Sequence, residues 1–229
     1  MKNMRILLLS VIAMLCGSNI NAQSLKIYKN DGTTITVPYS ELDRIEAVAE
    51  EEKSNHEYVD LGLSVKWATC NIGATSPEEA GDFFAWGEIA PKDTYDATNS
   101  VTNGVHVDEY SGNPDFDAAS ALWGGGARTP TSAEIEELIG QCTFQWTTQN
   151  NVGGMLVTGP NENTIFLPAA GTFDGSTITL TDQIGTYWSS TPFGDNDDRG
   201  CVIQFYFFGD YSSFWGYRKL GYPIRPVCK

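Results

Sequence analysis

Hydrophobic and polar residues alternate most regularly near the amino terminus. Two short alternating segments are separated by Asn30-Asp31-Gly32. An Asp-Gly step between two such segments is typical of a β-hairpin. The strand positions are Leu25, Ile27, Ile35 and Val37, followed by Ile45 in a third short strand. A module of this size buries little core by itself, so residues 23–48 predict a small β module that accompanies a larger domain.

Helical periodicity is clear in only one place. Thr131 and Glu134 have the spacing of a capping box and come directly after Pro130. The i, i+3, i+4, i+7 spacing then places four residues on one helical face: Ile135, Leu138, Ile139 and Cys142. A weaker helical pattern covers residues 117–123. We therefore expect one well-defined helix whose apolar face packs against the core.

The remaining pattern is one of short strands separated by turn signals. The strand-like segments are 65–68, 83–86, 164–167, 186–189, 202–208 and 222–227. Short antiparallel strands, few helices and long loops predict an irregular α+β domain over residues 58–229. Residues 49–57 are charged and lack large apolar side chains, which predicts a linker between this domain and the β module.

The first 22 residues have the pattern of a secretory signal. Lys2 and Arg5 precede a ten-residue apolar run over 6–15, and small polar residues follow it. The run is too short to cross a bilayer. We expect cleavage after Ala22 and a secreted or cell-surface protein. Lipid attachment at Cys16 is the alternative, although Leu15 is larger than the residue that such processing favours.

The chain is strongly acidic, with a net charge of −15. Loss of the first 22 residues leaves 12 basic against 29 acidic side chains, and therefore a net charge of −17. Such a charge repels phosphate backbones and anionic lipid surfaces. We therefore expect no nucleic-acid partner and no membrane span, and we interpret the charge as a source of solubility.

Four cysteines follow the signal: Cys70, Cys142, Cys201 and Cys228. An even number in an exported chain predicts two disulfides, for which three pairings are possible. Their order and spacing favour Cys70 with Cys142 and Cys201 with Cys228. The chain has no Cys-x-x-Cys motif, so we expect no structural zinc and no cofactor.

The inventory of chemically active residues argues against catalysis. The two histidines are His56, in the predicted linker, and His106, in a loop, whereas histidine-dependent catalysis needs a histidine held in a packed domain. Asp82 and Glu88 flank an aromatic segment but lie too far apart on one strand for a retaining glycosidase pair. We predict no catalytic residues. A glycosidase-like enzyme or a degenerate oxidase is the alternative.

An acidic turn at residues 194–200 partly matches a calcium-binding loop. Asp195 and Asp197 occupy the first and third positions, but Arg199 and Tyr206 stand where oxygen ligands belong. The turn therefore fails as an EF-hand. A looser calcium site that includes Asp198 stays open at this stage, and an exposed acidic turn is the preferred interpretation.

Aromatic residues are concentrated near the carboxyl terminus. Nine of them, a third of those in the chain, lie within residues 205–222. Residues 202–208 predict a nearly buried strand that turns at Gly209-Asp210. The mixture of aromatic, Ser and Gly residues that follows is typical of a recognition surface. The predicted ligand-binding residues are Tyr211, Phe214, Trp215, Tyr217, Arg218 and Tyr222. The alternative is a hairpin whose aromatics only cover the sheet.

The other tryptophans are dispersed along the chain, each near the end of a predicted element. They are Trp67, Trp86, Trp123, Trp146 and Trp188. Large aromatic side chains in this arrangement are typical of a hydrophobic core. We expect these five residues to be structural.

Several segments together resemble a known family. They are "EYVDLGLSVKWATCNIGATSPEEAGDFFAWGE", "ARTPTSAEIEELIGQCTFQW", "IFLPAAG", "YWSS" and "GYPIRPV". Their order over residues 56–229 is similar to that of the Fibrobacter succinogenes major paralogous domain, a group of exported bacterial proteins. The segment "LKIYKNDGTTITVPYSELDRI" resembles the small module often attached to such domains.

The resemblance implies a C-type-lectin-like fold, related to the scaffold of the formylglycine-generating enzyme and to retroelement-diversified variable proteins. In the variable proteins the ligand surface lies near the carboxyl end, which corresponds here to residues 211–222. The Glu-Pro-Asn and Trp-Asn-Asp motifs of calcium-dependent lectins are missing, and Cys201 and Cys228 are too far apart for the oxidase pair. The fold can therefore carry over without either chemistry.

Taken together, these patterns predict a non-catalytic, secreted or cell-surface module that recognises a protein or a glycan through its aromatic segment. The alternative is a structural protein of the cell surface, in which the aromatic segment packs internally or against a neighbouring subunit. In that case the amino-terminal hairpin would assist assembly.

Overall fold

A computed structural model describes residues 24–28, 33–41, 56–195 and 197–229. The chain divides into two compact units, residues 1–50 and residues 51–229. The boundary at residue 50 falls within the segment 49–57 that the sequence analysis assigns to a linker. His56 and Glu57, assigned above to the linker, belong to the larger unit: the carbonyl of Glu57 accepts a hydrogen bond of 2.9 Å from the amide of Thr69.

The amino-terminal unit contains the expected hairpin. Strand β1 (Ser24–Tyr28) pairs antiparallel with β2 (Thr34–Pro38), with Ile27 opposite Ile35, and a short 3₁₀ helix η1 (Tyr39–Glu41) follows. Ile35 is exposed, as expected for a module too small to bury its apolar side. The predicted turn at 30–32, the third strand at Ile45 and the signal segment lie outside the described residues.

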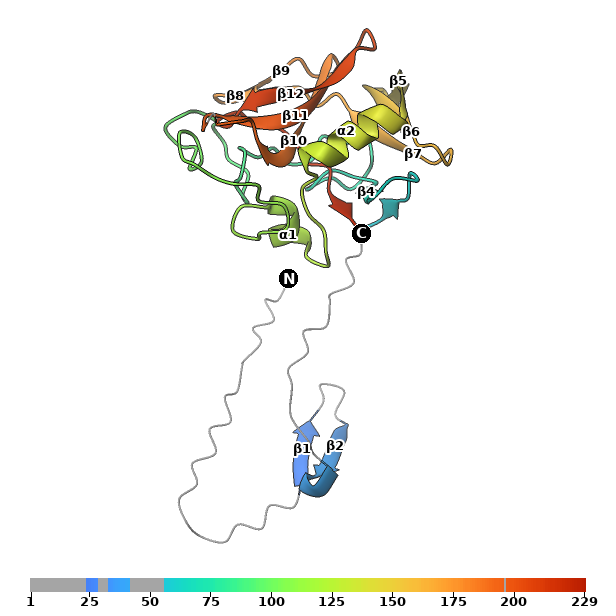
Figure 1. Cartoon of the computed structure of the whole chain (residues 1–229), viewed down its shortest axis with the longest axis vertical. Helices are drawn as coiled ribbons and strands as arrows, with labels where there is room; N and C mark the ends of the chain where they lie inside the picture. The colour runs from blue at the N-terminus through green and yellow to red at the C-terminus, as the bar shows by residue number, and fades with distance from the viewer. Residues whose placement is uncertain (1–23, 29–32, 42–55, 196) are drawn as a thin grey trace. The chain divides into compact units, whose positions relative to one another are not determined.

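The larger unit is built from small antiparallel sheets and two α-helices, which confirms the α+β class (Figure 1). One sheet has the order β13-β4-β3, formed by Val227–Cys228, Lys66–Ala68 and Tyr58–Val59. A second contains β5 (Thr143–Gln149), β6 (Val152–Thr158) and β7 (Thr164–Pro168). A third contains β10 (Ile184–Pro192), β11 (Arg199–Tyr206) and β12 (Tyr211–Tyr217). The fourth is a ribbon of β8 (Thr172–Asp174) and β9 (Thr177–Thr179).

The beginning and the end of the larger unit are hydrogen-bonded to the same strand. β4 lies between β3 and β13, with Trp67 opposite both Val59 and Val227. Figure 1 accordingly shows the carboxyl terminus beside β4. This pairing closes the unit, because all of its other elements lie between β4 and β13 in the sequence.

The capped helix forms as the sequence predicts. In α2 (Ser132–Gln141) the Thr131 hydroxyl accepts from the Glu134 amide at 3.3 Å, and the Glu134 carboxylate accepts from the Thr131 amide at 2.9 Å. Arg128 donates to the same carboxylate at 2.8 Å. The shorter α1 (Ala118–Trp123) is capped by Asp117. Both predicted helices are therefore confirmed.

The core consists of two main clusters. The first lies where α2 packs against the β10–β12 sheet and the β5–β7 sheet, and includes Ile135, Leu138, Cys142, Met155, Val157, Leu167, Ile203 and Phe205. The second gathers Phe84, Trp86, Tyr110, Trp188, Val202, Tyr222 and Ile224. Trp67, Trp86 and Trp188 are fully buried, and Trp123 and Trp146 are partly buried against the clusters. The interpretation of the five dispersed tryptophans as core residues is confirmed.

A buried arginine links distant segments of the larger unit. Arg225 is 1% exposed, and its guanidinium donates to the Asn71 side chain at 2.7 Å and to the carbonyls of Ala68, Thr69 and Phe166 at 3.1, 2.5 and 3.0 Å. Burial lowers the pKa of Arg225 from its ordinary value. Burial of an ionised group is costly unless its donors are satisfied, so the four acceptors stabilise the charge.

Some predicted strands are shorter than expected. Within 83–86 only Phe84 forms a β-bridge, to Tyr222, and 222–227 contributes bridges and the two residues of β13. These segments are held by isolated backbone hydrogen bonds to distant parts of the chain, such as those between Phe84 and Tyr222, and a local periodicity pattern does not report such pairs. The hairpin of β5 and β6 and the β8–β9 ribbon were not predicted, although β5 alternates polar and apolar residues from Thr143 to Thr147. β6 lacks this alternation, and β8 and β9 have only three residues each.

The disulfide prediction requires correction: all four cysteines of the described residues are free thiols. Cys142 lies in the core at the end of α2, and Cys70 lies beyond β4. Cys201 lies on β11, and Cys228 lies on β13 in a different sheet. The spacing of the cysteines in the sequence did not reveal that the members of each predicted pair lie on different elements, because spacing does not specify which sheet a strand joins.

The thiols give the first testable prediction. Burial raises the pKa of the Cys142 thiol to about 11 from an ordinary value of 9.0. Since the thiolate is the reactive form, alkylation of Cys142 in the native protein at pH 8 should be about a hundredfold slower than in the unfolded protein. Mass spectrometry after timed alkylation measures this ratio. If unfolding released thiols only after a reductant was added, the assignment of free cysteines would be wrong.

The buried face of α2 gives a second testable prediction. Leu138 is fully buried beneath α2, so Leu138→Ala should lower the free energy of unfolding by about 2–5 kcal/mol through lost apolar burial and a residual cavity. Urea denaturation measures the change. Glu136→Ala, on the exposed side of the same helix, is the control and should change stability by no more than about 0.5 kcal/mol. Equal effects would contradict the assigned face.

Candidate binding surface on the carboxyl-terminal hairpin

The aromatic segment forms a β-hairpin. β11 and β12 pair antiparallel with Arg199 opposite Tyr217 and Cys201 opposite Trp215. The chain turns at Gly209, whose φ of 97° suits glycine, and the Tyr206 amide donates to the Asp210 carbonyl at 2.9 Å. The turn at Gly209-Asp210 is therefore confirmed, but the predicted strand over 202–208 is confirmed only to Tyr206: Phe207 and Phe208 belong to the turn and are exposed rather than buried.

The inner face of the hairpin is packed against tryptophans. Gly200 and Gly216 face each other across the two strands. A Cβ atom at Gly200 would lie 2.4 Å from the Trp86 ring, and one at Gly216 would lie 2.6 Å from Tyr222 and 3.0 Å from Trp188. The glycines thus allow the large rings to contact the hairpin backbone directly, which holds it on the core.

Four of the six predicted binding residues lie at the surface to different degrees. Phe214 is 48% exposed and Tyr217 is 39% exposed, while Trp215 and Tyr211 are half-buried. The Tyr211 ring stacks on Phe144 of β5 with 4.2 Å between ring centroids. Tyr211 therefore serves packing between sheets as well as the surface.

Arg218 and Tyr222 were predicted at the surface, and this is wrong. They are 1% and 5% exposed. β12 ends at Tyr217, whose carbonyl accepts from the amide of Leu220 in a turn that leads the chain inward. Tyr222 then packs on Trp188, and burial raises the pKa of its hydroxyl to about 12.

Two surface residues near Trp215 come from outside the predicted set. The Arg199 guanidinium lies 3.8 Å from the ring centroid of Trp215 and 5.4 Å from that of Tyr217. The Phe193 ring lies 6.2 Å from Trp215. Phe193 and Arg199 flank the acidic turn before β11, so their proximity depends on strand register, which the sequence pattern alone did not reveal. We call Phe193, Arg199, Phe214, Trp215 and Tyr217 the aromatic cluster.

A cleft adjoins the aromatic cluster and shares Tyr217 with it. Its lining residues are Ala97, Asn103, Asp174, Asp198, Tyr217, Lys219 and Leu220, and its volume is about 500 Å³. Asp198 lies 3.6 Å from the guanidinium of Arg199, which links the charges of the cleft to the cluster. The cleft thus combines an aromatic ring with acidic, basic and amide groups.

Arg218 holds one wall of this cleft from beneath. Its guanidinium donates to the carbonyls of Arg199, Thr102 and Val105 at 3.1, 3.2 and 2.7 Å. It also lies over the Trp86 ring, 4.0 Å from the centroid. Burial lowers its pKa. Because Thr102 and Val105 flank the position of Asn103, Arg218 fixes the loop that carries this cleft residue against β11.

The acidic turn is not organised as a calcium loop. Asp197 faces His106, with 3.3 Å between Oδ1 and Nδ1, and Asp198 faces Arg199. Over the described residues, no three His, Cys, Asp or Glu side chains gather as a metal site. The exposed side chain of Asp195 joins neither pair.

Glu88 and His56 have structural partners. Glu88 pairs with Lys92 at 2.7 Å and accepts from the Val101 amide at 2.9 Å. The His56 ring stacks on Trp123, with 3.6 Å between ring centroids, and burial lowers its pKa. Each group thus stabilises a loop or a domain edge in the described fold.

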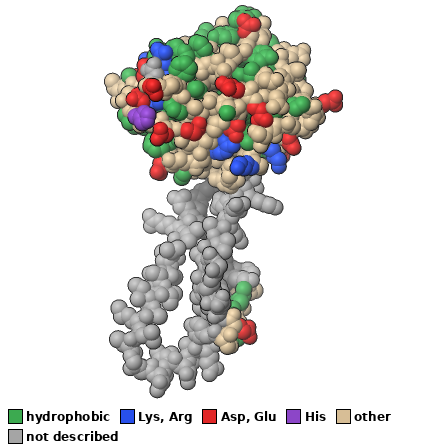
Figure 2. Space-filling model, viewed as in Figure 1, with side chains coloured by type: hydrophobic (Ala, Val, Ile, Leu, Met, Phe, Trp, Pro, Cys, Tyr) green, Lys and Arg blue, Asp and Glu red, His purple; other side chains and the backbone are tan. Residues whose placement is uncertain are grey.

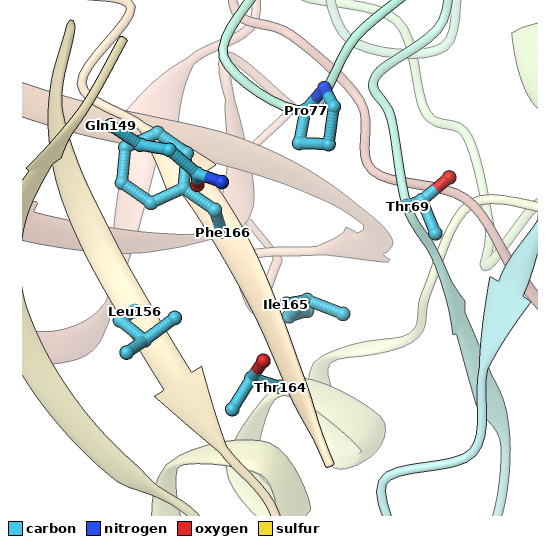
Figure 3. Close-up of a pocket in the computed structure, with 7 residues that line it drawn as sticks. All are labelled: Thr69, Pro77, Gln149, Leu156, Thr164, Ile165 and Phe166. Carbon is cyan, nitrogen blue, oxygen red and sulfur yellow. The ribbon is translucent and has the colours of Figure 1, made fainter. Parts of the chain in front are cut away.

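Other concave regions have different linings. The pocket in Figure 3 lies on β7 and is lined by Thr69, Pro77, Gln149, Leu156, Thr164, Ile165 and Phe166. No charged side chain lines it. Figure 2 shows acidic side chains spread over one face of the molecule with hydrophobic ones between them. A pocket lined by Glu88, Lys92 and Asp115 also has both signs of charge, but the cleft beside Tyr217 differs from it by sharing an exposed ring with the aromatic cluster.

Comparison of the chain with models of known protein families, with curated proteins and with solved structures found no match in any of the three. Among the helices of the described residues, none has the length and apolar character to cross a membrane.

The role of Arg218 gives a third prediction. Arg218→Met should lower the free energy of unfolding by about 1–3 kcal/mol, because it leaves buried carbonyl oxygens without donors. Urea denaturation measures the loss. Lys219→Met is the neighbouring control, and we expect a change within about 0.5 kcal/mol, because the Lys219 ammonium donates to no group in the described part of the chain. A stable Arg218→Met protein would show that the loop is held by other contacts.

Proposed function

We propose that this protein is a non-catalytic binding module that recognises a protein or a glycan through the aromatic cluster. The observation that carries the proposal is the grouping of exposed Phe214 and Tyr217 with Trp215 around the Arg199 guanidinium. Rigid aromatic side chains contribute contact area at small entropic cost, and Arg adds directional donors. Such residues dominate binding energy in many interfaces.

The rigidity of the hairpin supports this proposal. Its inner face packs through Gly200 and Gly216 against buried rings, and Arg218 fixes the loop beside it. A binding surface that is ordered before it meets a ligand loses less entropy on binding. The outer rings therefore have the support that a recognition surface needs.

We further propose a C-type-lectin-like fold for residues 58–229. The segments that resemble the major paralogous domain coincide with structural supports of this unit. "ARTPTSAEIEELIGQCTFQW" contains Arg128 and the capping box of α2, and "GYPIRPV" contains Arg225. "FFAWG" contains Trp86, over which the Arg218 guanidinium lies. These coincidences favour a shared scaffold.

We propose export of the protein to the cell surface or beyond. This rests on the basic, apolar and small-residue pattern of residues 1–22. Those residues lie outside the part of the chain that the structure describes. The acidic surface suits a soluble exported module.

A structural role in assembly is the second candidate. The tip of the β11–β12 hairpin carries Phe207 and Phe208, which are 55% and 61% exposed. Exposed apolar groups of this kind favour contact with another protein surface. Sedimentation that showed concentration-dependent oligomers, abolished by Phe207→Ser with Phe208→Ser, would favour this function over ligand recognition.

A binding screen tests the proposed function. The mature chain is applied to a glycan array and to a set of surface proteins, with calcium and with a chelator. Trp215→Ala and Tyr217→Ala should each weaken the resulting interaction by about tenfold or more. Phe208→Ala removes an exposed ring outside the cluster and is the matched control, expected to bind as the parent does. Binding that survives both cluster variants would contradict the assigned surface.

A further inference from the structure

We infer that the cleft beside Tyr217 binds a neutral oligosaccharide, an inference that rests on the proposed function and names its ligand class. The cleft is separate from the inner face of the hairpin, because it is formed by β8, the loop near Asn103, and the residues on either side of the hairpin's open end. Its volume of about 500 Å³ falls within the range of small-molecule sites.

The polar groups of the cleft have unused hydrogen-bonding capacity. Within the described parts of the chain, the carboxylates of Asp174 and Asp198, the amide of Asn103 and the ammonium of Lys219 make no hydrogen bond to protein. The nearest interaction is the Asp198–Arg199 contact at 3.6 Å, which is longer than a hydrogen bond. Four residues whose side chains make no hydrogen bond to protein therefore line one cleft. Oδ1 of Asp198 is buried, so the exposed part of this carboxylate is the part that can meet a ligand.

Sugar hydroxyls match this set of groups. A hydroxyl both donates and accepts, so it can donate to Asp174 or Asp198 and accept from Lys219 or Asn103. Tyr217 is exposed at the same cleft and presents a flat apolar face with a polar end. The C–H face of a pyranose ring can lie against such a face while its hydroxyls reach the polar walls.

The charge balance favours a neutral sugar. Two carboxylates face one ammonium, and the Arg199 guanidinium lies beside Asp198 at the rim. A strongly anionic ligand would meet Asp174, Asp198 and the negative charge of the whole chain. Trp215 contacts the Tyr217 ring edge to face at 5.2 Å and is itself covered by Arg199 and Phe214, so it supports the position of Tyr217 and offers no second stacking face.

The test uses the mature full chain and four neutral probes: cellotetraose, mannotetraose, xylotetraose and N-acetylchitotetraose, with tetragalacturonate as the anionic comparison. Titration calorimetry should detect binding of at least one neutral probe, unchanged by chelator, and none of tetragalacturonate. Asp198→Asn and Asp174→Asn should each weaken it by about tenfold, because a charge-assisted acceptor is lost. Asp195→Asn is the matched control in the same acidic turn and should bind as the parent does.

Several results would overturn the inference. One is the absence of binding to all four neutral probes by a protein that unfolds cooperatively. Another is binding that Asp174→Asn and Asp198→Asn leave unchanged. If the array and protein screen gave a ligand that required Trp215 but neither carboxylate, the inference would fail and the proposed function would stand. If a neutral probe bound through both carboxylates and required Tyr217 but tolerated Trp215→Ala, the cleft would stand and the aromatic cluster would fail as the recognition surface.

Discussion

The fold depends on two buried guanidinium groups that carbonyl and amide oxygens, rather than carboxylates, stabilise. Arg225 ties the end of β4 and the middle of β7 to the segment just before β13, and Arg218 ties the loop at 102–105 to the start of β11. Irregular segments contain many backbone carbonyls that receive no hydrogen bond from a helix or a β-sheet. One planar group with five donors can collect several of them at once. Long loops can therefore be packed tightly in a unit with few regular elements.

The same buried contacts hold the candidate site in place. Tryptophan rings fill the space under the hairpin because Gly200 and Gly216 leave room for them, and Arg218 lies over one of those rings while it holds the neighbouring loop. Arg199, Trp215 and Tyr217 lie on the opposite face of the same hairpin and reach the surface, whereas Phe214 shares the glycine face and is exposed at the edge strand β12. The same two strands thus pack against the core on one face and present polar and aromatic side chains at the surface on the other. This separation allows ligand contacts to change without loss of the core.

Local signals in the sequence predicted local structure well. The capping box at Thr131 and Glu134, the i, i+3, i+4 pattern after it, the strand as far as Tyr206 and the turn at Gly209-Asp210 form as expected. Each involves residues within a few positions of one another. The weakest predictions concerned distant partners: the cysteine pairs, the strands at 83–86 and 222–227, and the burial of Arg218 and Tyr222. A segment that contains arginine, tyrosine and serine has the composition of a surface even when its arginine is buried.

The sequence by itself determined the two-unit organisation, the α+β class, the capped helix and the aromatic hairpin, because these depend on periodicity and turn chemistry along the chain. Only the tertiary structure decided which aromatics face outward, that Phe193 and Arg199 join Trp215, and that Asp174 and Asn103 meet Tyr217 at one cleft. Those residues lie tens of positions apart in the sequence. Strand register and the burial of Arg218 bring them together, and neither is encoded in any single local pattern.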